Sequence, residues 1–373
     1  MAKPPGPPYP AKTAGLGGLP TKTVDIPICA VFLLLFLCGA VSHMFIFQTN
    51  RRRGHKFIMS GMLFGFCMAR IVTQIMRITW ACHPTNVSVA IASQVFVAAG
   101  VVLVFVINII FAQRIFRARH PHLGWHRIAH YSFIGIYVLI VVTLVMLIIS
   151  VVQSFYTLNA HTKHIDRAIT LYGQTLYAII AFLPIPIVLV SVFILPRAQK
   201  RPEKFGSGRW RHKIGILLVS SGLLCLGAAF RVGINYTGGT RPREDPAGYQ
   251  SKACFYIFNF GVEIVVVLAY VVVRVDKRFW VPDHSHQAGD YMRTDAEKLR
   301  GIAGAGAGAV GEKSSSSEEG TGREEGRFRR EESKLANIVG PEEEIFDDDH
   351  EQAEAVAHQP PVKATERGVG SAV

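Results

Sequence analysis

Residues 89–112 read VAIASQVFVAAGVVLVFVINIIFA, a run of 24 residues without a charged side chain. In a helix, about 20 residues of this kind cross the hydrocarbon core of a bilayer. Six further, mainly apolar runs of comparable length occur before residue 280, and none occurs after it. The sequence therefore predicts an all-α, polytopic membrane protein, a seven-transmembrane helix bundle. The predicted spans are Ile26–Gln48, Phe57–Trp80, Val89–Ala112, Ile128–Val152, Ala168–Leu195, Ile214–Tyr236 and Ala253–Val273.

The spans divide the chain into three predicted regions: a disordered extracellular terminus (1–25), the transmembrane domain (26–280) and a disordered cytosolic tail (281–373). Tail disorder is expected because a segment rich in Gly, Ser and blocks of like charge buries too little apolar surface to offset the conformational entropy lost on folding. The serines at 314–317 lie beside two glutamates and suit either a phosphorylated regulatory segment or a solvated linker. Within the fifth span, Pro184 and Pro186 remove two backbone donors and predict a kinked helix.

The net charge of +13 is distributed unevenly along the chain. Residues 1–280 hold 29 Lys and Arg against 7 Asp and Glu, whereas residues 281–373 hold 11 against 20. Alternate loops carry 18 basic residues on one side of the predicted membrane and 8 on the other. The positive-inside rule then places the amino terminus outside and the carboxyl terminus in the cytosol, with the plasma membrane as the expected location.

The basic loops also bear on partners. A short basic loop held against a bilayer is expected to attract anionic lipid, at about 1 kcal/mol for each well-placed charge. The same surface suits a cytosolic signalling protein, and the sequence does not separate these two uses. Nucleic acid is not expected as a partner, because the positive charge lies in the loops next to the membrane.

Four charged residues fall inside the predicted spans: Arg70, Arg77, Arg231 and Glu263. Each costs at least about 2.5–3.5 kcal/mol in a bilayer on insertion scales, so each suggests a function. At about 1.5 Å of rise per residue, Arg70 and Glu263 lie at similar depth near the membrane centre. We therefore predict an ion pair between them.

Arg77 and Arg231 lie nearer the outer surface, without a predicted intramembrane acid. Gln74 shares a helix face with Arg77. The two guanidinium groups either snorkel to the headgroups or line an outward-facing cavity and bind an anion, since a guanidinium offers a planar fork to carboxylate or phosphate. On the second interpretation, Arg77, Arg231 and Gln74 are the candidate ligand-binding residues.

Two further features concern the predicted outer face. Cys82 and Cys254 lie next to membrane spans, where an oxidising compartment permits a disulfide bond between them, although spacing cannot fix connectivity. Asn86-Val87-Ser88 is a glycosylation sequon. A second sequon begins at Asn235, and both lie close to a membrane boundary.

A histidine cluster precedes the fourth span, in the sequence HPHLGWHRIAH at residues 120–130. His126 and His130 are four residues apart and suit a shared metal on one helix face. No second histidine cluster and no neighbouring acid accompany them. We therefore predict no metal, no cofactor and no enzymatic activity, and keep a membrane metalloenzyme as the weakest alternative.

Three stretches carry a resemblance to a known family: ARIVTQIMRITW (69–80), the long segment from His83 to Trp125, and INYTGGT (234–240). Together they resemble a fungal family of seven-transmembrane proteins of unknown function, some members of which are labelled family-C-like G-protein-coupled receptors. The resemblance covers residues 20–280. It implies a seven-helix fold and a receptor label, without a ligand or an active site.

Some established receptor patterns are absent from this sequence. The third span ends in AQRIF and not in an acidic-Arg-aromatic triplet, and the seventh lacks an Asn-Pro-x-x-Tyr element. These departures put G-protein coupling in doubt. Our first functional hypothesis is a receptor-like sensor of a small or lipidic anion. The alternative is a transporter or lipid translocase, in which Arg70 and Glu263 form a gate.

Overall fold

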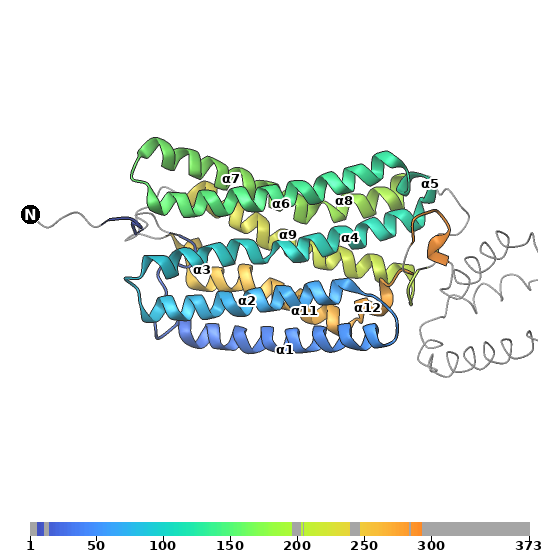
Figure 1. Cartoon of the computed structure of the whole chain (residues 1–373), viewed down its shortest axis with the longest axis horizontal. Coiled ribbons are helices and arrows are strands. Elements are labelled where there is room, and N and C mark those ends of the chain that lie inside the picture. The colour runs from blue at the N-terminus through green and yellow to red at the C-terminus, as the bar shows by residue number, and fades with distance from the viewer. Residues whose placement is uncertain are drawn as a thin grey trace, which may run out of the picture.

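Seven long helices run side by side in the computed structural model of the chain (Figure 1). The structure describes residues 6–10, 15–195, 203, 205–238, 247–282 and 285–292, and every regular element in this part of the chain is a helix or a helical turn. Each of the seven is long and apolar enough to cross a membrane, which confirms the predicted fold. The candidate spans are Asp25–Arg52, Ile58–Cys82, Val87–Arg119, Arg127–Tyr156, Ala160–Ile194, Trp210–Thr237 and Lys252–Val272.

Four spans are single helices, and three are interrupted. The single helices are α1 (Asp25–Arg52), α2 (Ile58–Cys82), α6 (Arg127–Tyr156) and α9 (Trp210–Gly238). The third span consists of α3 (Val87–Gly100) and α4 (Val102–Arg119). The fifth span consists of α7 (Ala160–Phe182), α8 (Pro184–Leu189) and the π-helical turn η1 (Val190–Ile194). The seventh span consists of α10 (Lys252–Tyr256), the π-helical turn η3 (Ile257–Gly261) and α11 (Val262–Val272).

Short elements connect or follow the spans. They are α5 (Pro121–Gly124), η2 (Gly248–Gln250), α12 (Val275–Arg278) and η4 (Asp290–Met292). Successive spans alternate in direction, so the bundle has two ends. We call the end where α1 begins the amino-terminal face and the end where α11 finishes the carboxyl-terminal face.

The break in the fifth span occurs at the predicted kink. Pro184 and Pro186 begin a new helix directly after Leu183, and the span continues beyond them to Ile194. Arg119, the last residue of α4, and His120 directly after it contact carbonyls of the π-helical turn η1. Arg119 Nη2 donates to the Val192 carbonyl at 3.1 Å, and His120 Nε2 lies 2.9 Å from the Ser191 carbonyl oxygen. The kinked span is thereby joined to the third span.

The third span lies at the centre of the bundle. Figure 1 shows α1 and α2 along one edge, α6 and α7 along the other, and α4 with α9 between them. α4 contacts α2, α6, α7, α8 and α9, and its apolar side chains are mostly buried. The peripheral helices α1 and α6 instead present exposed apolar residues such as Phe45, Leu34, Val138 and Val141. Such a surface suits contact with lipid. Its side chains are apolar, and the backbone N–H and C=O groups are hydrogen-bonded within each helix.

The structure describes packed segments next to the bundle at both ends, within the regions predicted to be disordered. Residues 15–24 fold over the amino-terminal face, where the Gly17 N–H donates to the Gln250 carbonyl at 2.9 Å. Residues 285–292 pack at the carboxyl-terminal face, where Tyr291 is buried. Local contacts with the bundle supply the stabilisation that composition alone did not indicate. Residues 1–5, 11–14 and 293–373, also predicted to be disordered, lie outside the described part of the chain.

Candidate ligand-binding site

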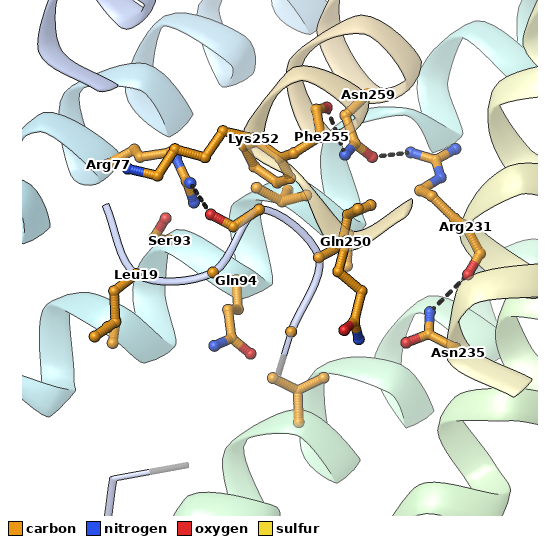
Figure 2. A pocket seen from close by; sticks show the side chains of 18 of the residues that line it. Leu19, Arg77, Ser93, Gln94, Arg231, Asn235, Gln250, Lys252, Phe255 and Asn259 are labelled. Carbon is orange, nitrogen blue, oxygen red and sulfur yellow. Dashed lines mark hydrogen bonds between the residues drawn. The ribbon is translucent and has the colours of Figure 1, made fainter. Parts of the chain in front are cut away.

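A cavity of about 790 Å³ opens at the amino-terminal face. Its walls come from α2, α3, α6, α7, α9, the start of the seventh span and the segment 15–19. Most of the lining side chains are apolar, and a few polar groups converge on the space between them (Figure 2). The polar and charged side chains that line it include Arg77, Gln94, Gln174, Arg231, Asn235, Gln250, Lys252 and Asn259.

Arg77 is held by a buried carboxylate at the rim of the cavity. Its Nη2 lies 2.9 Å from Asp25 Oδ1, and the two side chains are 3% and 0% exposed. The Tyr256 hydroxyl donates to the same carboxylate at 2.7 Å, and Lys252 pairs with its other oxygen. The sequence analysis expected no intramembrane acid near Arg77, which was wrong. The charge of Arg77 is matched within the protein.

The same guanidinium holds residues 15–19 onto the bundle. Arg77 Nη2 donates to the Gly17 carbonyl at 3.2 Å, and its Cζ lies 4.0 Å from the centroid of the Phe255 ring. Gly17 has a φ of +78°, and a Cβ built there would lie 2.6 Å from Phe255 Cγ. Only glycine fits this conformation and this close approach. We call residues 15–24 the strap.

Deeper in the bundle, Arg70 and Glu263 form the predicted ion pair. Two parallel hydrogen bonds of 2.6 Å join Arg70 Nε and Nη2 to the two carboxylate oxygens. Arg70 Nη1 also donates to the Phe96 and Val97 carbonyls, at 3.2 and 3.1 Å. The side chains of the pair are 0% and 2% exposed. A bidentate pair whose remaining donors are also used is the geometry that offsets the cost of burying both charges.

Arg231 approaches the same carboxylate from α9 but bonds to it less closely. Its Nη1 lies 3.8 Å from Glu263 Oε1 and 3.4 Å from Asn259 Oδ1, and 17% of the side chain is exposed. Figure 2 shows the guanidinium beside Asn259 at the side of the cavity. Both oxygens of Glu263 already accept from Arg70 at 2.6 Å. Arg231 therefore shares a carboxylate that is mainly occupied by another guanidinium.

These contacts leave an excess of positive charge beside the cavity. Two carboxylates, Asp25 and Glu263, face four cations. Four positive charges against two negative ones leave two in excess. In a site surrounded by apolar side chains, such an excess attracts an anion more strongly than it would in water. The four cations are Arg70, Arg77, Arg231 and Lys252.

Gln74 does not line the cavity, although we predicted it as a ligand-binding residue. Its side chain is fully buried on α2, and within the described structure neither its amide nitrogen nor its amide oxygen has a hydrogen-bond partner. From α2, the lining of the cavity includes Arg77 and Trp80 but not Gln74. Of the three predicted ligand-binding residues, the structure brings only Arg77 and Arg231 to the cavity.

The predicted disulfide bond between Cys82 and Cys254 is not formed, because both cysteines are free thiols. Cys82 is exposed at the end of α2, and Cys254 is half-buried in the first turn of α10. Arg77 of α2 contacts the Phe255 and Tyr256 rings of α10. Cys82 follows it by five residues, which turns its side chain about 140° around the helix at about 100° per residue. The two thiols thus belong to different surfaces.

The two sequons differ in their surroundings. Asn86 is exposed and caps α3, where its Oδ1 accepts from the Val89 N–H at 3.3 Å. Glycosylation of Asn86 stays a prediction. Asn235 instead lies within α9 beside the cavity, and its Nδ2 donates to Gln174 Oε1 and, at 2.9 Å, to the Arg231 carbonyl. A side chain engaged in this way is a poor acceptor for a glycan.

The histidines of the predicted cluster have separate surroundings. His120 is buried against the π turn of the fifth span, His126 caps α6 through Nδ1, and His130 contacts the Tyr131 ring. Among the described residues, no group of three or more His, Cys, Asp or Glu is placed to hold a metal ion.

Asp25, Tyr256 and Lys252 are the site residues that the sequence analysis missed. Asp25 was assigned to a disordered terminus because it follows a Pro- and Gly-rich segment. A signal was nevertheless present, since an acidic residue directly before an apolar run is favourable in the first turn of a helix. Nothing in the local sequence identified Tyr256 or Lys252 as its partners.

The fold and the cavity define an integral membrane protein with seven candidate spans. A family model described as "Protein of unknown function (DUF3112)" matches residues 206–280, from just before α9 to just after α12. No curated protein and no solved structure matches the chain. The chain is thus similar to a family of unknown function over its sixth and seventh spans. These two spans carry Arg231, Asn259 and Glu263.

Proposed function

We propose that the protein is a receptor-like sensor that binds an amphiphilic anion in the cavity at its amino-terminal face. Arg231 carries this proposal, because it is the partly exposed cation that reaches the cavity while sharing its carboxylate with Arg70. An anionic head group would take up the donors of Arg231, with Asn235 and Gln174 beside it. The proposal assigns no reaction to the cavity.

The apolar walls suit the remainder of such a ligand. Val97 and Val101 of the third span face the cavity together with Leu147 and Val151 of α6 and Phe155 at its end. A volume of about 790 Å³ lies within the range of about 300–1,000 Å³ that is common for small-molecule sites. A few placed polar groups among apolar walls favour an anion with a hydrocarbon body over a small inorganic ion.

The orientation follows from charge. Loops at the carboxyl-terminal face carry 18 basic residues against 8 at the other face, which supports a cytosolic location for the former. The cavity would then open to the outside of the cell, with the plasma membrane as the proposed location. The basic loops and the tail would contact inner-leaflet lipids and a cytosolic signalling protein.

The geometry also suggests how binding would be transmitted. Arg231 lies on α9, whereas its partners Glu263 and Asn259 lie on the seventh span. A ligand that drew Arg231 away from Glu263 would weaken the contact between these two spans. Asn259 sits in a π turn, an element that often marks functional sites. The response would be a shift of α9 relative to α11, extending to the carboxyl-terminal face.

Binding can be measured with cis-parinaric acid, a fluorescent polyene carboxylate, on the full chain in lipid nanodiscs. We expect saturable binding that is lost with the methyl ester of the probe. Arg231→Gln should weaken it at least about tenfold, since a hydrogen bond to a charged group contributes about 1.5–3 kcal/mol. The affinity of Arg231→Lys for the probe should lie between that of the wild type and that of Arg231→Gln. Arg51→Gln, an exposed arginine at the other face, is the matched control.

Two results would overturn the assignment. Equal affinity for the ester and the acid would mean that no cation of the protein binds the carboxylate of the probe. Unchanged affinity in Arg231→Gln, with thermal stability preserved, would remove the proposed site. Sealed vesicles test the alternative function: net movement of the probe across the membrane, dependent on Arg70 and Glu263, would favour a transporter or translocase over a sensor.

A further inference from the structure

Two polar side chains of α3, Ser93 and Gln94, line the cavity at the amino-terminal face. Gln94 lies on the same stripe of the helix as two other lining residues, Ala90 and Val97, so this stripe of α3 faces the cavity. Neither polar side chain forms a hydrogen bond within the described part of the chain. Their hydrogen-bonding groups are therefore available to a ligand in the cavity.

The Ser93 hydroxyl differs from other hydroxyl groups on the spans. Ser42, Thr73 and Thr79 each donate to the backbone carbonyl four residues earlier, at 2.8, 2.8 and 2.9 Å. Such a bond is a common way for a serine or threonine within a helix to satisfy its hydroxyl. Ser93 makes no such bond, although the residue is only 1% exposed. A buried hydroxyl without a partner costs free energy, which a polar group of a ligand would recover.

The neutral polar groups around Arg231 are instead bonded within the protein. Asn235 Nδ2 donates to Gln174 Oε1 and to the Arg231 carbonyl. Asn259 Nδ2 donates to the Phe255 carbonyl at 2.9 Å, and its Oδ1 lies 3.4 Å from Arg231 Nη1. This part of the cavity therefore offers a ligand mainly the charge of a guanidinium, whereas the α3 stripe offers neutral donors and acceptors.

These two sets of polar groups lie at different places in the cavity. Figure 2 shows Ser93 and Gln94 toward one side and Arg231 with Asn235 toward the other. A projection can shorten a separation but cannot lengthen it, so the two sets are also apart in space. Because the remaining lining is mainly apolar, a ligand that reaches both sets carries two polar groups joined by a hydrocarbon segment.

The separation is within reach of one hydrocarbon chain. Arg231 Nη1 lies 3.8 Å from Glu263 Oε1, and Glu263 is bonded to Arg70. Arg70 Nη1 in turn donates to the Val97 carbonyl of α3 at 3.1 Å. Gln94 is three residues before Val97, which is about 4.5 Å along the helix axis. Two intervening side chains and one helical turn thus connect the guanidinium to the polar stripe of α3.

We propose that the ligand of the cavity is a hydroxylated amphiphilic carboxylate whose hydroxyl group is bound by Ser93 and Gln94. This inference rests on the proposed function, which places the carboxylate at Arg231. The serine hydroxyl and the glutamine amide can each donate to a ligand hydroxyl and accept from it. Such a site discriminates against the same acid without the hydroxyl, because a plain hydrocarbon chain would cover both polar side chains without satisfying them.

The test measures how octadecanoic acid and its 10-, 12- and 18-hydroxy derivatives displace cis-parinaric acid from the full chain in lipid nanodiscs. We expect at least one hydroxy acid to bind the wild type about threefold to tenfold more tightly than octadecanoic acid, as one additional hydrogen bond predicts. In Ser93→Ala/Gln94→Leu this order should reverse, because the substitutions remove the hydrogen-bonding groups and add apolar surface. Gln153→Leu on α6, an exposed glutamine that is not among the described lining residues, should keep the wild-type order.

The quantity compared is the ratio of the affinities for a hydroxy acid and octadecanoic acid within each variant, so that differences in lipid partitioning cancel. An equal ratio in the wild type and the double variant would overturn the assignment of Ser93 and Gln94. Tightest binding of octadecanoic acid to the wild type would exclude a hydroxylated ligand. The single variants Ser93→Ala and Gln94→Leu give the same ratio if the double variant fails to fold.

Arg231→Gln separates this inference from the proposed function. Unchanged affinity of this variant for octadecanoic acid would overturn the proposed function and the hydroxyl site together. Weaker binding of octadecanoic acid by Arg231→Gln, combined with no preference of the wild type for any hydroxy acid, would overturn the hydroxyl site alone.

Discussion

Gly100 on α3 makes room for the guanidinium of Arg70 on α2. A Cβ built on Gly100 would lie 2.8 Å from Arg70 Nη1 and 2.9 Å from its Cζ, closer than real Cβ contacts. The same guanidinium donates to the Phe96 and Val97 carbonyls in the turn before the glycine. The contact between α2 and α3 is therefore built around one buried charge, and the missing side chain permits it.

Gly100→Ala should destabilise the protein by about 1–3 kcal/mol, because an added methyl group in a packed core forces its neighbours to shift. Gly135 of α6 is the matched control, since a Cβ there meets nothing within 4 Å. Gly135→Ala should be neutral or stabilise slightly, because alanine favours a helix over glycine. Thermal unfolding in detergent measures both. Equal effects of the two variants would contradict the proposed role of Gly100.

Glu263→Gln should be more damaging than Arg70→Met. Removing the carboxylate leaves two guanidinium groups without their shared anion, and breaking a buried pair costs about 3–5 kcal/mol. Removing Arg70 instead leaves Glu263 with Arg231, whose Nη1 is already 3.8 Å from Oε1. The thermal unfolding midpoints of the two variants and the wild type test this order. The reverse order would mean that Arg231 does not neutralise Glu263.

The membrane spans and the Arg70–Glu263 contact could be predicted because they depend on simple quantities. Span positions follow from the length of apolar runs, and the ion pair follows from the similar depth of two opposite charges. Rise per residue gives depth directly, and a buried charge in a bilayer requires a partner. Neither inference needs knowledge of how the helices pack.

The cavity could be predicted only in part, because its shape depends on packing. Gln74 and Arg77 share one helix face, yet Arg77 lines the cavity and Gln74 is buried outside it. Asp25 was missed because its partners Arg77 and Lys252 are 52 and 227 residues away in sequence. Long-range contacts of this kind, including the strap, leave no local periodicity to detect.

Asp25→Asn should release the strap. The carboxylate joins Arg77 and Lys252, so an amide would leave two cations at the rim without their shared anion. We expect a lower thermal midpoint and faster hydrogen exchange at the Gly17 amide, which donates to the Gln250 carbonyl. Lys22→Gln is the control, since Lys22 is exposed on the same segment. Unaltered exchange in Asp25→Asn would show that the strap is held by other contacts.

Cys82 provides a direct test of the orientation. Its free thiol is exposed at the amino-terminal face, so a membrane-impermeant maleimide should label Cys254→Ser, which retains Cys82, on intact cells and should not label Cys82→Ser/Cys254→Ser. In that background, His122→Cys at the opposite face should react only after permeabilisation. The reverse pattern would place the cavity toward the cytosol. Labelling of Cys82 only after reduction would indicate that Cys82 forms a disulfide bond, which the structure does not contain.

Two acids at the carboxyl-terminal face should give the stability of the protein opposite responses to pH. Burial raises the pKa of Glu203, although the Gly289 N–H partly offsets this effect. Burial also acts on Asp276, but hydrogen bonds from Arg274 and Asn50 outweigh it and lower the pKa of that carboxyl. Native Glu203 thus binds its proton more tightly than the unfolded chain does, and native Asp276 binds its proton less tightly.

The stability that protonated Glu203 contributes is complete below its ordinary pKa of 4.5, and it is lost as pH rises through the raised native value. Glu203→Gln keeps the acceptor for Gly289 and cannot ionise, so the wild type should lose stability relative to this variant as pH rises. Asp276→Asn should behave oppositely. The wild type should exceed it above the ordinary pKa of 3.8, and the difference should shrink as pH falls through the lowered native value. Unfolding midpoints measured across acid and neutral pH give both differences, and parallel profiles for the two variants would contradict the assigned shifts.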